Sequence, residues 1–244
     1  MEHITIPLLK RREERPASPT RAAHKADPIM LNTEPISTLI GCEPSLFYAI
    51  SKRLFDVVLA LFCMLLLIPV FALIAMCIKL DDGGPVLHFR EIIGRHGRRF
   101  YALKFRTMRP DADAYLAAHP ELMRKFRKNM KLEHDPRITR VGTFLRKTSL
   151  DELPQLFNVL IGQMSLVGPR IIHPSELPRY REYALKRLSV RPGITGLWQI
   201  SGRQHISYKE RVQFDMRYID TRSFFVDLVI LVKTLKVFIV HTGA

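Results

Sequence analysis

The longest apolar stretch of the chain runs from Val57 to Ile78, where 22 successive positions carry no charged side chain. A helix rises about 1.5 Å per residue, so this stretch would span about 33 Å, against about 30 Å for the hydrocarbon core of a bilayer. The pattern therefore predicts a membrane-inserted helical segment. Pro69 divides it into two parts that are each too short to cross, and proline removes a backbone hydrogen bond and kinks a helix.

Basic residues lie on both sides of this stretch. Lys52 and Arg53 precede it, together with several Lys and Arg nearer the start, and further basic residues follow it. Because segments rich in Lys and Arg stay on the cytoplasmic side, both flanks are expected there. A re-entrant hairpin bent at Pro69 satisfies this rule, whereas a kinked single span leaves one flank outside. We expect Lys52, Arg53 and Asp56 where the chain meets the lipid headgroups.

Apolar periodicity divides the rest of the chain. Residues 1–47 combine prolines with basic side chains and lack apolar periodicity, which predicts a disordered basic tail. Residues 48–80 form the predicted hairpin, and residues 81–244 form a domain on the cytoplasmic face. Short apolar segments at 86–89 and 100–105, a charged helix at 112–131 and a second helix at about 153–160 indicate a mainly helical α+β fold.

An apolar segment near the end, residues 224–240, is interrupted by Asp227, Lys233 and Lys236. Three charges make a membrane span unfavourable, so we expect an interfacial helix that lies on the membrane. A buried core helix is the alternative.

The formal net charge of +15 over 244 residues favours an anionic partner, which composition alone does not identify. Nucleic acid, phosphorylated small molecules and acidic lipid all fit. The sequence contains neither a GxxxxGK[ST] phosphate loop nor GxGxxG, so ATP hydrolysis and dinucleotide redox chemistry lack their usual signatures.

Two adjacent carboxylates, Asp151 and Glu152, lie in the segment SLDELPQL. A capping box that begins at Ser149 would place Pro154 fifth in the helix, where its missing N–H removes a hydrogen bond. A helix that begins at Asp151 makes Pro154 a first-turn residue and puts both carboxylates at the end that favours metal-bound phosphate. One carboxylate could then attack phosphorus while the other holds Mg²⁺. Spacing alone leaves both interpretations open.

Basic side chains recur in short motifs around this pair, and arginine's planar guanidinium suits phosphate recognition. A turn rich in Pro and Gly, residues 192–196, precedes Trp198 and could bring backbone N–H groups and a stacking ring to a nucleotide. Taken singly, each basic residue is commonly a solvated surface charge. The candidate phosphate- and nucleotide-binding residues are Lys104, Arg106, Arg137, Arg170, Arg191, Thr195, Gly196 and Gln199.

The motifs KFRTM, SLDELPQL, MSLVGPR and RPGITGLWQ follow one another in this order after Lys52, Arg53 and Asp56. Together they resemble the bacterial sugar transferase family, the monotopic phosphoglycosyl transferases, over about residues 52–240. The resemblance implies an enzyme on the cytoplasmic face of the bacterial inner membrane. It would transfer hexose-1-phosphate from a UDP-hexose, with galactose or glucose, to undecaprenyl phosphate, and so initiate exopolysaccharide or other lipid-linked glycan synthesis.

The resemblance also implies roles for residues. Asp151 would attack the β-phosphorus of the donor and form a covalent phosphosugar intermediate, and Glu152 would hold Mg²⁺. Arg170 and Arg191 would contact phosphates, with Thr195, Gly196 and Gln199 near the nucleotide. Membrane lipid is an expected partner, nucleic acid is not, and a homo-oligomer is left open.

Two other function classes remain. Asp111 and Asp113 form a DxD motif, which many glycosyltransferases use for metal, although here it lies in a charged, helical stretch. Such an enzyme would release UDP rather than UMP. A membrane-anchored scaffold with a basic surface is the non-enzymatic alternative, and its binding to polyanions would weaken steeply with salt.

Overall fold

The structure is a computed structural model that describes residues 45–129, 132, 134–201 and 206–240. The tail predicted for residues 1–47 lies outside the described residues except for positions 45–47, which begin the first helix. All the described residues belong to a single compact unit, Ile36–Ala244.

Two consecutive helices occupy the apolar stretch. Helix α2 (Leu46–Leu66) begins where the Ser45 Oγ accepts from the Tyr48 N–H, and α3 (Ile68–Asp82) follows after a 60° bend. The break lies at Leu67, two residues before the predicted position, because Pro69 is accommodated in the first turn of α3, where a helical N–H has no partner. Within the described part of the chain, neither helix alone is long and apolar enough to cross a membrane, but the bent pair meets that criterion.

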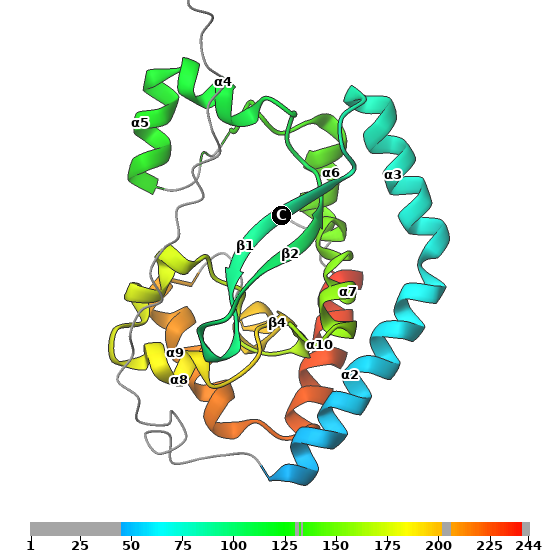
Figure 1. The fold of residues 1–244 in the computed structure, drawn as a ribbon, viewed down its shortest axis with the longest axis vertical. Coiled ribbons are helices and arrows are strands. Elements are labelled where there is room, and N and C mark those ends of the chain that lie inside the picture. The colour runs from blue at the N-terminus through cyan, green and yellow to red at the C-terminus, as the bar shows by residue number, and fades with distance from the viewer. Residues whose placement is uncertain (1–44, 130–131, 133, 202–205, 241–244) are drawn as a thin grey trace, which may run out of the picture. The chain divides into compact units, whose positions relative to one another are not determined.

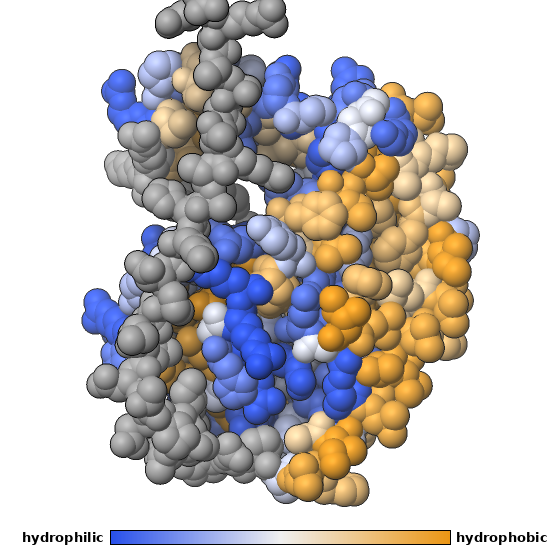
Figure 2. All heavy atoms as spheres, viewed as in Figure 1, coloured by the Kyte–Doolittle hydropathy of each residue, from blue (hydrophilic) through white to orange (hydrophobic). Residues whose placement is uncertain are grey.

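The surface of this pair is apolar. Figure 1 shows α2 and α3 along one side of the described domain, and Figure 2 shows hydrophobic side chains covering that side. Several large apolar residues there are more than half exposed: Phe47, Ile50, Leu54, Val58, Phe62, Leu65, Leu66, Ile68, Leu73, Met76 and Leu80.

Two small sheets lie within the domain. Strands β1 (Leu87–Ile93) and β2 (Arg99–Phe105) form an antiparallel hairpin, and β3 (Ser165–Val167) pairs in parallel with β4 (Gly193–Thr195). The remaining described elements are helical: α4 (Ala112–Ala118), α5 (Pro120–Asn129), α6 (Arg140–Thr148), η2 (Leu150–Glu152), α7 (Gln155–Leu160), η3 (Pro174–Tyr183), α8 (Ala184–Leu188), η4 (Leu197–Ile200), α9 (Tyr208–Thr221) and α10 (Phe224–Val240).

These elements confirm the mainly helical α+β class. The single helix predicted at 112–131 was wrong, because the chain leaves the helix at His119 and starts again at Pro120, and residue 131 lies outside the described residues. Proline at 120 disfavours helical geometry for the residue before it, which explains the break.

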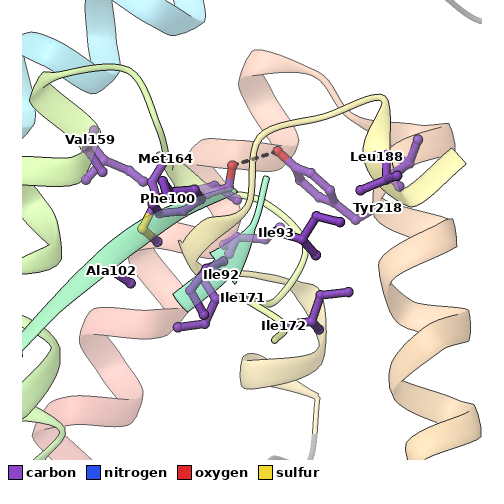
Figure 3. Packing of buried hydrophobic residues seen from close by; sticks show 14 of the residues in the cluster. Ile92, Ile93, Phe100, Ala102, Val159, Met164, Ile171, Ile172, Leu188 and Tyr218 are labelled. Atoms are coloured by element: carbon purple, nitrogen blue, oxygen red, sulfur yellow. Dashed lines mark hydrogen bonds between the residues drawn. The ribbon is translucent and has the colours of Figure 1, made fainter. Parts of the chain in front are cut away.

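The main core gathers apolar side chains from the hairpin, α7, β3 and α9 (Figure 3). Ile92 and Ala102 of the hairpin are fully buried, and the Tyr218 hydroxyl donates to the Val167 carbonyl over 3.1 Å. Ala60 of α2 is also fully buried in this cluster. One side of α2 is therefore part of the domain core.

Polar residues at the start of α2 bind other parts of the domain. The Arg53 guanidinium donates to the carbonyls of Val159 and Leu160, at the end of α7. Lys52 forms an ion pair with Asp227 of α10 at 2.7 Å. Their polar groups thus have partners inside the protein, and the position of Lys52 and Arg53 at the level of the headgroups stays a prediction.

Asp56 was placed at the headgroups too, and it is likewise internal. It is buried, and its carboxylate accepts from the Ser165 Oγ at 2.7 Å and from the Leu166 N–H at 3.1 Å. The three residues thus join α2 to α7, β3 and α10.

Helix α10 has one buried and one exposed side. Asp227 and Ile230 are buried, whereas Phe225, Val232 and Leu235 are more than half exposed. The helix therefore packs on the domain, and its contact with a membrane stays a prediction.

Candidate active site

The two adjacent carboxylates lie in a short 3₁₀ turn, not at an α-helix start. Ser149 ends α6 in the left-handed conformation, with φ of 56°, and its side chain caps nothing. Asp151 and Glu152 then occupy η2, and α7 begins only after Pro154. Both the capping box and the helix that starts at Asp151 were therefore wrong, and the carboxylates owe their position to the turn between α6 and α7.

Lys104 of β2 binds both carboxylates. Its Nζ lies 2.5 Å from Glu152 Oε1 and 3.8 Å from Asp151 Oδ2. The Asp151 side chain is only 12% exposed, whereas the Glu152 side chain is 35% exposed. One carboxylate is thus held inside the protein while its neighbour reaches solvent, so the two can perform different tasks.

The environment of Asp151 changes its acidity. Burial raises the pKa of Asp151 from 3.8 to about 6, although the charges of Lys104 and Arg146 act in the opposite direction, and the nearby Glu152 raises it further. At neutral pH the carboxylate is mostly ionised yet poorly solvated, and poor solvation favours reaction with an electrophile.

A further basic residue, Arg146, lies near this pair. Arg146 of α6 donates through Nε to Thr107 Oγ1 at 2.8 Å, and burial lowers the pKa of Arg146. His88 is the cross-strand partner of Lys104 in the hairpin. Burial and the charge of Lys104 lower the pKa of His88, so this imidazole is neutral at neutral pH. The carboxylates therefore lie beside positive charge on β2 and α6.

The carboxylate pair fits Mg²⁺ as a cofactor. Across the described residues no group of three or more His, Cys, Asp or Glu side chains is placed to hold a metal ion. Mg²⁺ is ordinarily bound by one or two carboxylates, with substrate phosphates and waters completing its octahedron. Asp151 and Glu152 offer this donor set, and the contact of Lys104 shows that a cation is accommodated there.

A second cluster forms around Trp198 of η4. The Arg170 and Arg211 guanidiniums lie 4.9 and 5.0 Å from its ring centroid. The chain is tightly packed here, because a Cβ on Gly196 would lie 2.2 Å from the Gly168 carbonyl oxygen. Within the described structure, the buried Gln199 Oε1 and Trp198 Nε1 have no hydrogen-bond partner. Two cations, an aromatic ring and the free Trp198 N–H together suit an anionic ligand.

Comparison with known proteins gives the family. The profile described as Bacterial sugar transferase matches residues 47–241. The chain belongs to the bacterial sugar transferase family. The resemblance seen in the sequence motifs and the assignment to a family of transferases are thereby confirmed.

Relatives of two lengths share this region. Exopolysaccharide production protein ExoY of Rhizobium meliloti is 46% identical over 80% of this chain and 88% of its own length. Undecaprenyl-phosphate galactose phosphotransferase of Salmonella typhimurium is 45% identical over 79% of this chain, but the match covers 41% of that protein. An uncharacterised sugar transferase of Haemophilus influenzae, 47% identical, is matched over 42% of its length. The chain thus spans less than half the length of these two longer relatives.

Two of the predicted phosphate-binding arginines are occupied by protein carboxylates. Arg106 is buried and paired with Asp82, and its Nη1 donates to the Met108 carbonyl at 2.8 Å. Arg137 is buried against Asp135, with 2.6 Å between Nη2 and Oδ2. The Arg106–Asp82 pair joins the residue after β2 to the end of α3, and the Arg137–Asp135 pair lies within a single loop. Both arginines therefore have partners inside the protein. Their predicted contact with phosphate stays a prediction.

The other predicted residues lie in three places. Arg170, Gly196 and Gln199 come together in the cluster around Trp198, whereas Arg191 donates through Nε to the Gly162 carbonyl at 2.8 Å, beyond the end of α7. Thr195 shares a 2.7 Å hydrogen bond with Thr234 of α10. Of the predicted phosphate and nucleotide residues, only Lys104 is in contact with the carboxylate pair.

The rival DxD motif lies at the start of α4. Arg109 Nε contacts Asp111 Oδ1 at 2.5 Å, and the two side chains are exposed. The described residues around Asp113 include no further carboxylate cluster for a metal. The geometry therefore favours the interpretation of this motif as a solvated surface.

Several residues near these clusters were missed by sequence reasoning. Arg211 and Asp215 lie on α9, three and seven residues after Tyr208, and this spacing places all three on one helix face. That periodicity was readable, but nothing in the sequence indicated that the face meets Trp198. His88 was missed because its position depends on the register of the hairpin.

Proposed function

We propose that this chain is a phosphoglycosyl transferase that moves hexose-1-phosphate from a UDP-hexose to undecaprenyl phosphate. The observation that carries the proposal is the Asp151–Glu152 pair, with one buried and one accessible carboxylate beside Lys104. A buried carboxylate with a raised pKa suits a nucleophile, and an accessible neighbour suits a metal ligand.

The reaction proceeds in two displacements at one phosphorus atom. An Asp151 carboxylate oxygen bonds to the β-phosphorus of the donor, and the bond from that phosphorus to the bridging oxygen breaks, so UMP leaves. The enzyme then carries an aspartyl phosphate ester of the hexose. A phosphate oxygen of undecaprenyl phosphate attacks the same phosphorus, and Asp151 is released as its carboxylate. The product is a lipid diphosphate hexose.

The side chains around Asp151 have separate tasks in this scheme. Glu152, with Asp151 beside it, would hold Mg²⁺, which when bound neutralises charge on the diphosphate. Lys104 is close enough to both carboxylates to orient Asp151 and to contact a donor phosphate. Arg146 adds a positive charge near the reacting atoms. These cations favour the pentavalent arrangement, whose oxygens carry more negative charge than those of the free donor.

The acceptor requires contact with a membrane. The bent α2–α3 pair, with its apolar surface and with basic residues before and after it, supports a re-entrant insertion from the cytoplasmic face of the inner membrane. The chain would then enter and leave the membrane on its cytoplasmic side. This keeps the carboxylates accessible to a soluble UDP-hexose and to a lipid phosphate.

Names of relatives suggest the hexose. One relative is a galactose phosphotransferase, and another, from Xanthomonas campestris, is a UDP-glucose:undecaprenyl-phosphate glucose-1-phosphate transferase with 38% identity over 80% of this chain. We therefore propose UDP-galactose or UDP-glucose as donor, and exopolysaccharide synthesis as the process, by analogy with ExoY.

Intact-protein mass spectrometry tests the covalent step. The full chain in detergent is incubated with Mg²⁺ and UDP-galactose or UDP-glucose, without lipid acceptor. The wild type is expected to gain the mass of a hexose phosphate and to release UMP, whereas Asp151→Asn gains no mass because its amide cannot displace UMP.

Asp111→Asn is the matched control, because it removes the rival motif's first carboxylate. It is expected to form the adduct as the wild type does. Release of UDP in place of UMP once undecaprenyl phosphate is added, with no adduct on any variant, would sink the proposal in favour of direct glycosyl transfer.

A further inference from the structure

The backbone of Arg170 is held from both sides by charged side chains. Its N–H donates to Asp215 Oδ1 of α9 at 3.3 Å, and its carbonyl accepts from Arg187 Nη2 of α8 at 2.5 Å. Arg170 follows Pro169 after β3 and forms an isolated parallel β-bridge with Gly193, whose N–H donates to the Pro169 carbonyl at 2.9 Å. The β-bridge holds one edge of this segment, and two side chains bind the N–H and the carbonyl of Arg170 itself.

Asp215 is built into the interior. It is 1% exposed, and its second oxygen accepts from the Tyr180 hydroxyl at 2.7 Å. Burial raises the pKa of Asp215 to about 6, with the charge of Arg187 acting in the opposite direction. The carboxylate is thus ionised at neutral pH and hydrogen-bonded at both oxygens.

Arg187 is fully buried at 0% exposure, and among the described residues its Nε and Nη1 have no hydrogen-bond partner. Burying a guanidinium is unfavourable unless it is paired, and leaving donors free adds to that penalty. Packing alone would be better served by an apolar side chain of similar volume. A buried cation whose hydrogen bond goes to the Arg170 carbonyl therefore points to a role at that peptide.

Support of the Arg170 backbone also determines where the Arg170 side chain points. Its guanidinium lies 4.9 Å from the Trp198 ring centroid, and Arg211, from the same face of α9 as Asp215, lies at 5.0 Å from that centroid. Two like charges share one ring, which an anion between or beside them would stabilise. A small rotation of the Arg170 peptide would move its guanidinium away from the ring.

We propose that Asp215 and Arg187 are positioning residues that fix the Arg170 backbone and thereby aim its guanidinium at the phosphates of the sugar-nucleotide donor. This inference rests on the proposed function, because it needs Arg170 to contact the donor. It adds two residues, from α8 and α9, that touch neither substrate nor metal.

A double-mutant cycle tests it. The full chain in detergent is assayed for UMP release with Mg²⁺, undecaprenyl phosphate and UDP-galactose or UDP-glucose. Asp215→Asn and Arg170→Ala are each expected to raise the KM for the donor roughly tenfold, with a smaller change in kcat. In the Arg170→Ala background, Asp215→Asn is expected to change KM by less than about twofold, because the group it positions is already gone.

Asp227→Asn is the matched control. Asp227 is 3% exposed and also accepts from a buried tyrosine, Tyr218, at 2.7 Å, but it does not contact Arg170. This variant is expected to lower thermal stability and to leave KM within about twofold of the wild type. Should Asp215→Asn fail to fold, Tyr180→Phe removes one hydrogen bond to Asp215, and a KM rise of about threefold that vanishes in the Arg170→Ala background is expected.

The outcomes separate the two ideas. Multiplicative effects of Asp215→Asn and Arg170→Ala, or a KM unchanged in Arg170→Ala while the wild type still releases UMP, would overturn the positioning role and leave the proposed function standing. No UMP from the wild type with either donor overturns both.

Discussion

At the scale of single residues, the buried position of Asp151 disfavours the negative charge of its carboxylate. Its carboxylate is buried, its pKa is raised to about 6, and the nearest cation lies 3.8 Å away rather than in hydrogen-bonding contact. An ionised group held in this way is less stable than the same group in water, and that loss of stability is the reactivity that a nucleophile needs.

The raised pKa predicts an effect of pH on stability in the metal-free protein. An unfolded carboxyl titrates near 3.8 and the folded one near 6, so the folded state binds more protons between these values. The contribution of Asp151 to stability is therefore fully present below pH 3.8 and is lost as pH rises through about 6. The loss amounts to at most roughly 3 kcal/mol. Asp151→Asn removes the charge, so at pH 8 it is expected to melt at a higher temperature than the wild type.

Thermal unfolding in EDTA at pH 5 and pH 8 measures this effect. The gap between Asp151→Asn and the wild type should be wide at pH 8 and narrow at pH 5. Equal gaps at both values would mean that Asp151 does not titrate in this range.

At the scale of elements, α6 carries the carboxylate turn and is held against the end of β2 by one close approach. A Cβ added to Gly142 would lie 2.1 Å from the Thr107 carbonyl oxygen, and one turn later Arg146 donates to the Thr107 hydroxyl. Gly142→Ala is expected to push α6 outward, to lower the free energy of unfolding by about 3 kcal/mol and to reduce UMP release.

Thr143→Ala tests the same helix on its exposed side. It is expected to change the free energy of unfolding by less than about 0.5 kcal/mol and to leave activity intact. A Gly142→Ala variant as stable and active as Thr143→Ala would show that α6 can shift without consequence. Chemical denaturation and UMP release measure both.

The sequence pattern predicted those elements that are determined by residues close to one another in the chain. Long apolar runs identified α2, α3 and α10, and the carboxylate pair was found from its spacing. The turn that holds the pair was missed, because Ser149 adopts a left-handed conformation that its side chain does not require and that only the surrounding packing fixes. Pairing of β3 with β4 joins segments with η3 and α8 between them, which no local pattern records.

Residue roles were harder to predict than elements, because a basic side chain has the same sequence signal in an ion pair as at a ligand. In the structure, Arg106 and Arg137 pair with internal carboxylates. Arg53 and Arg191 donate to backbone carbonyls, and Lys104 binds the carboxylate pair. Only the folded arrangement distinguishes these partners.

At the scale of the whole molecule, the proposed re-entrant geometry predicts that both ends of the α2–α3 pair face the cytoplasm. Two variants with a single cysteine test this in vesicles. One keeps the native Cys42, before α2, with Cys63→Ala and Cys77→Ala; the other adds Cys42→Ser and places a cysteine in exposed α5 through Glu121→Cys. A membrane-impermeant maleimide is expected to label both in inside-out vesicles and neither in right-side-out vesicles.

Detergent-lysed vesicles provide the control for reactivity, since both cysteines should then be labelled. Labelling of Cys42 in right-side-out vesicles, with the α5 cysteine protected, would establish a single kinked span instead.

The attachment of α2 has a practical consequence for anyone who seeks a soluble fragment. A truncation that begins after α3 removes Arg53 and Asp56, and so takes away the side chains that bind the Leu160 carbonyl and the Leu166 N–H. Each such group, if buried, destabilises a fold by about 1–3 kcal/mol. The fragment also loses Ala60 from the core. The apolar helix is therefore part of the catalytic domain's own folding unit, and the domain has to be produced together with the lipid or detergent that covers the outer side of that helix.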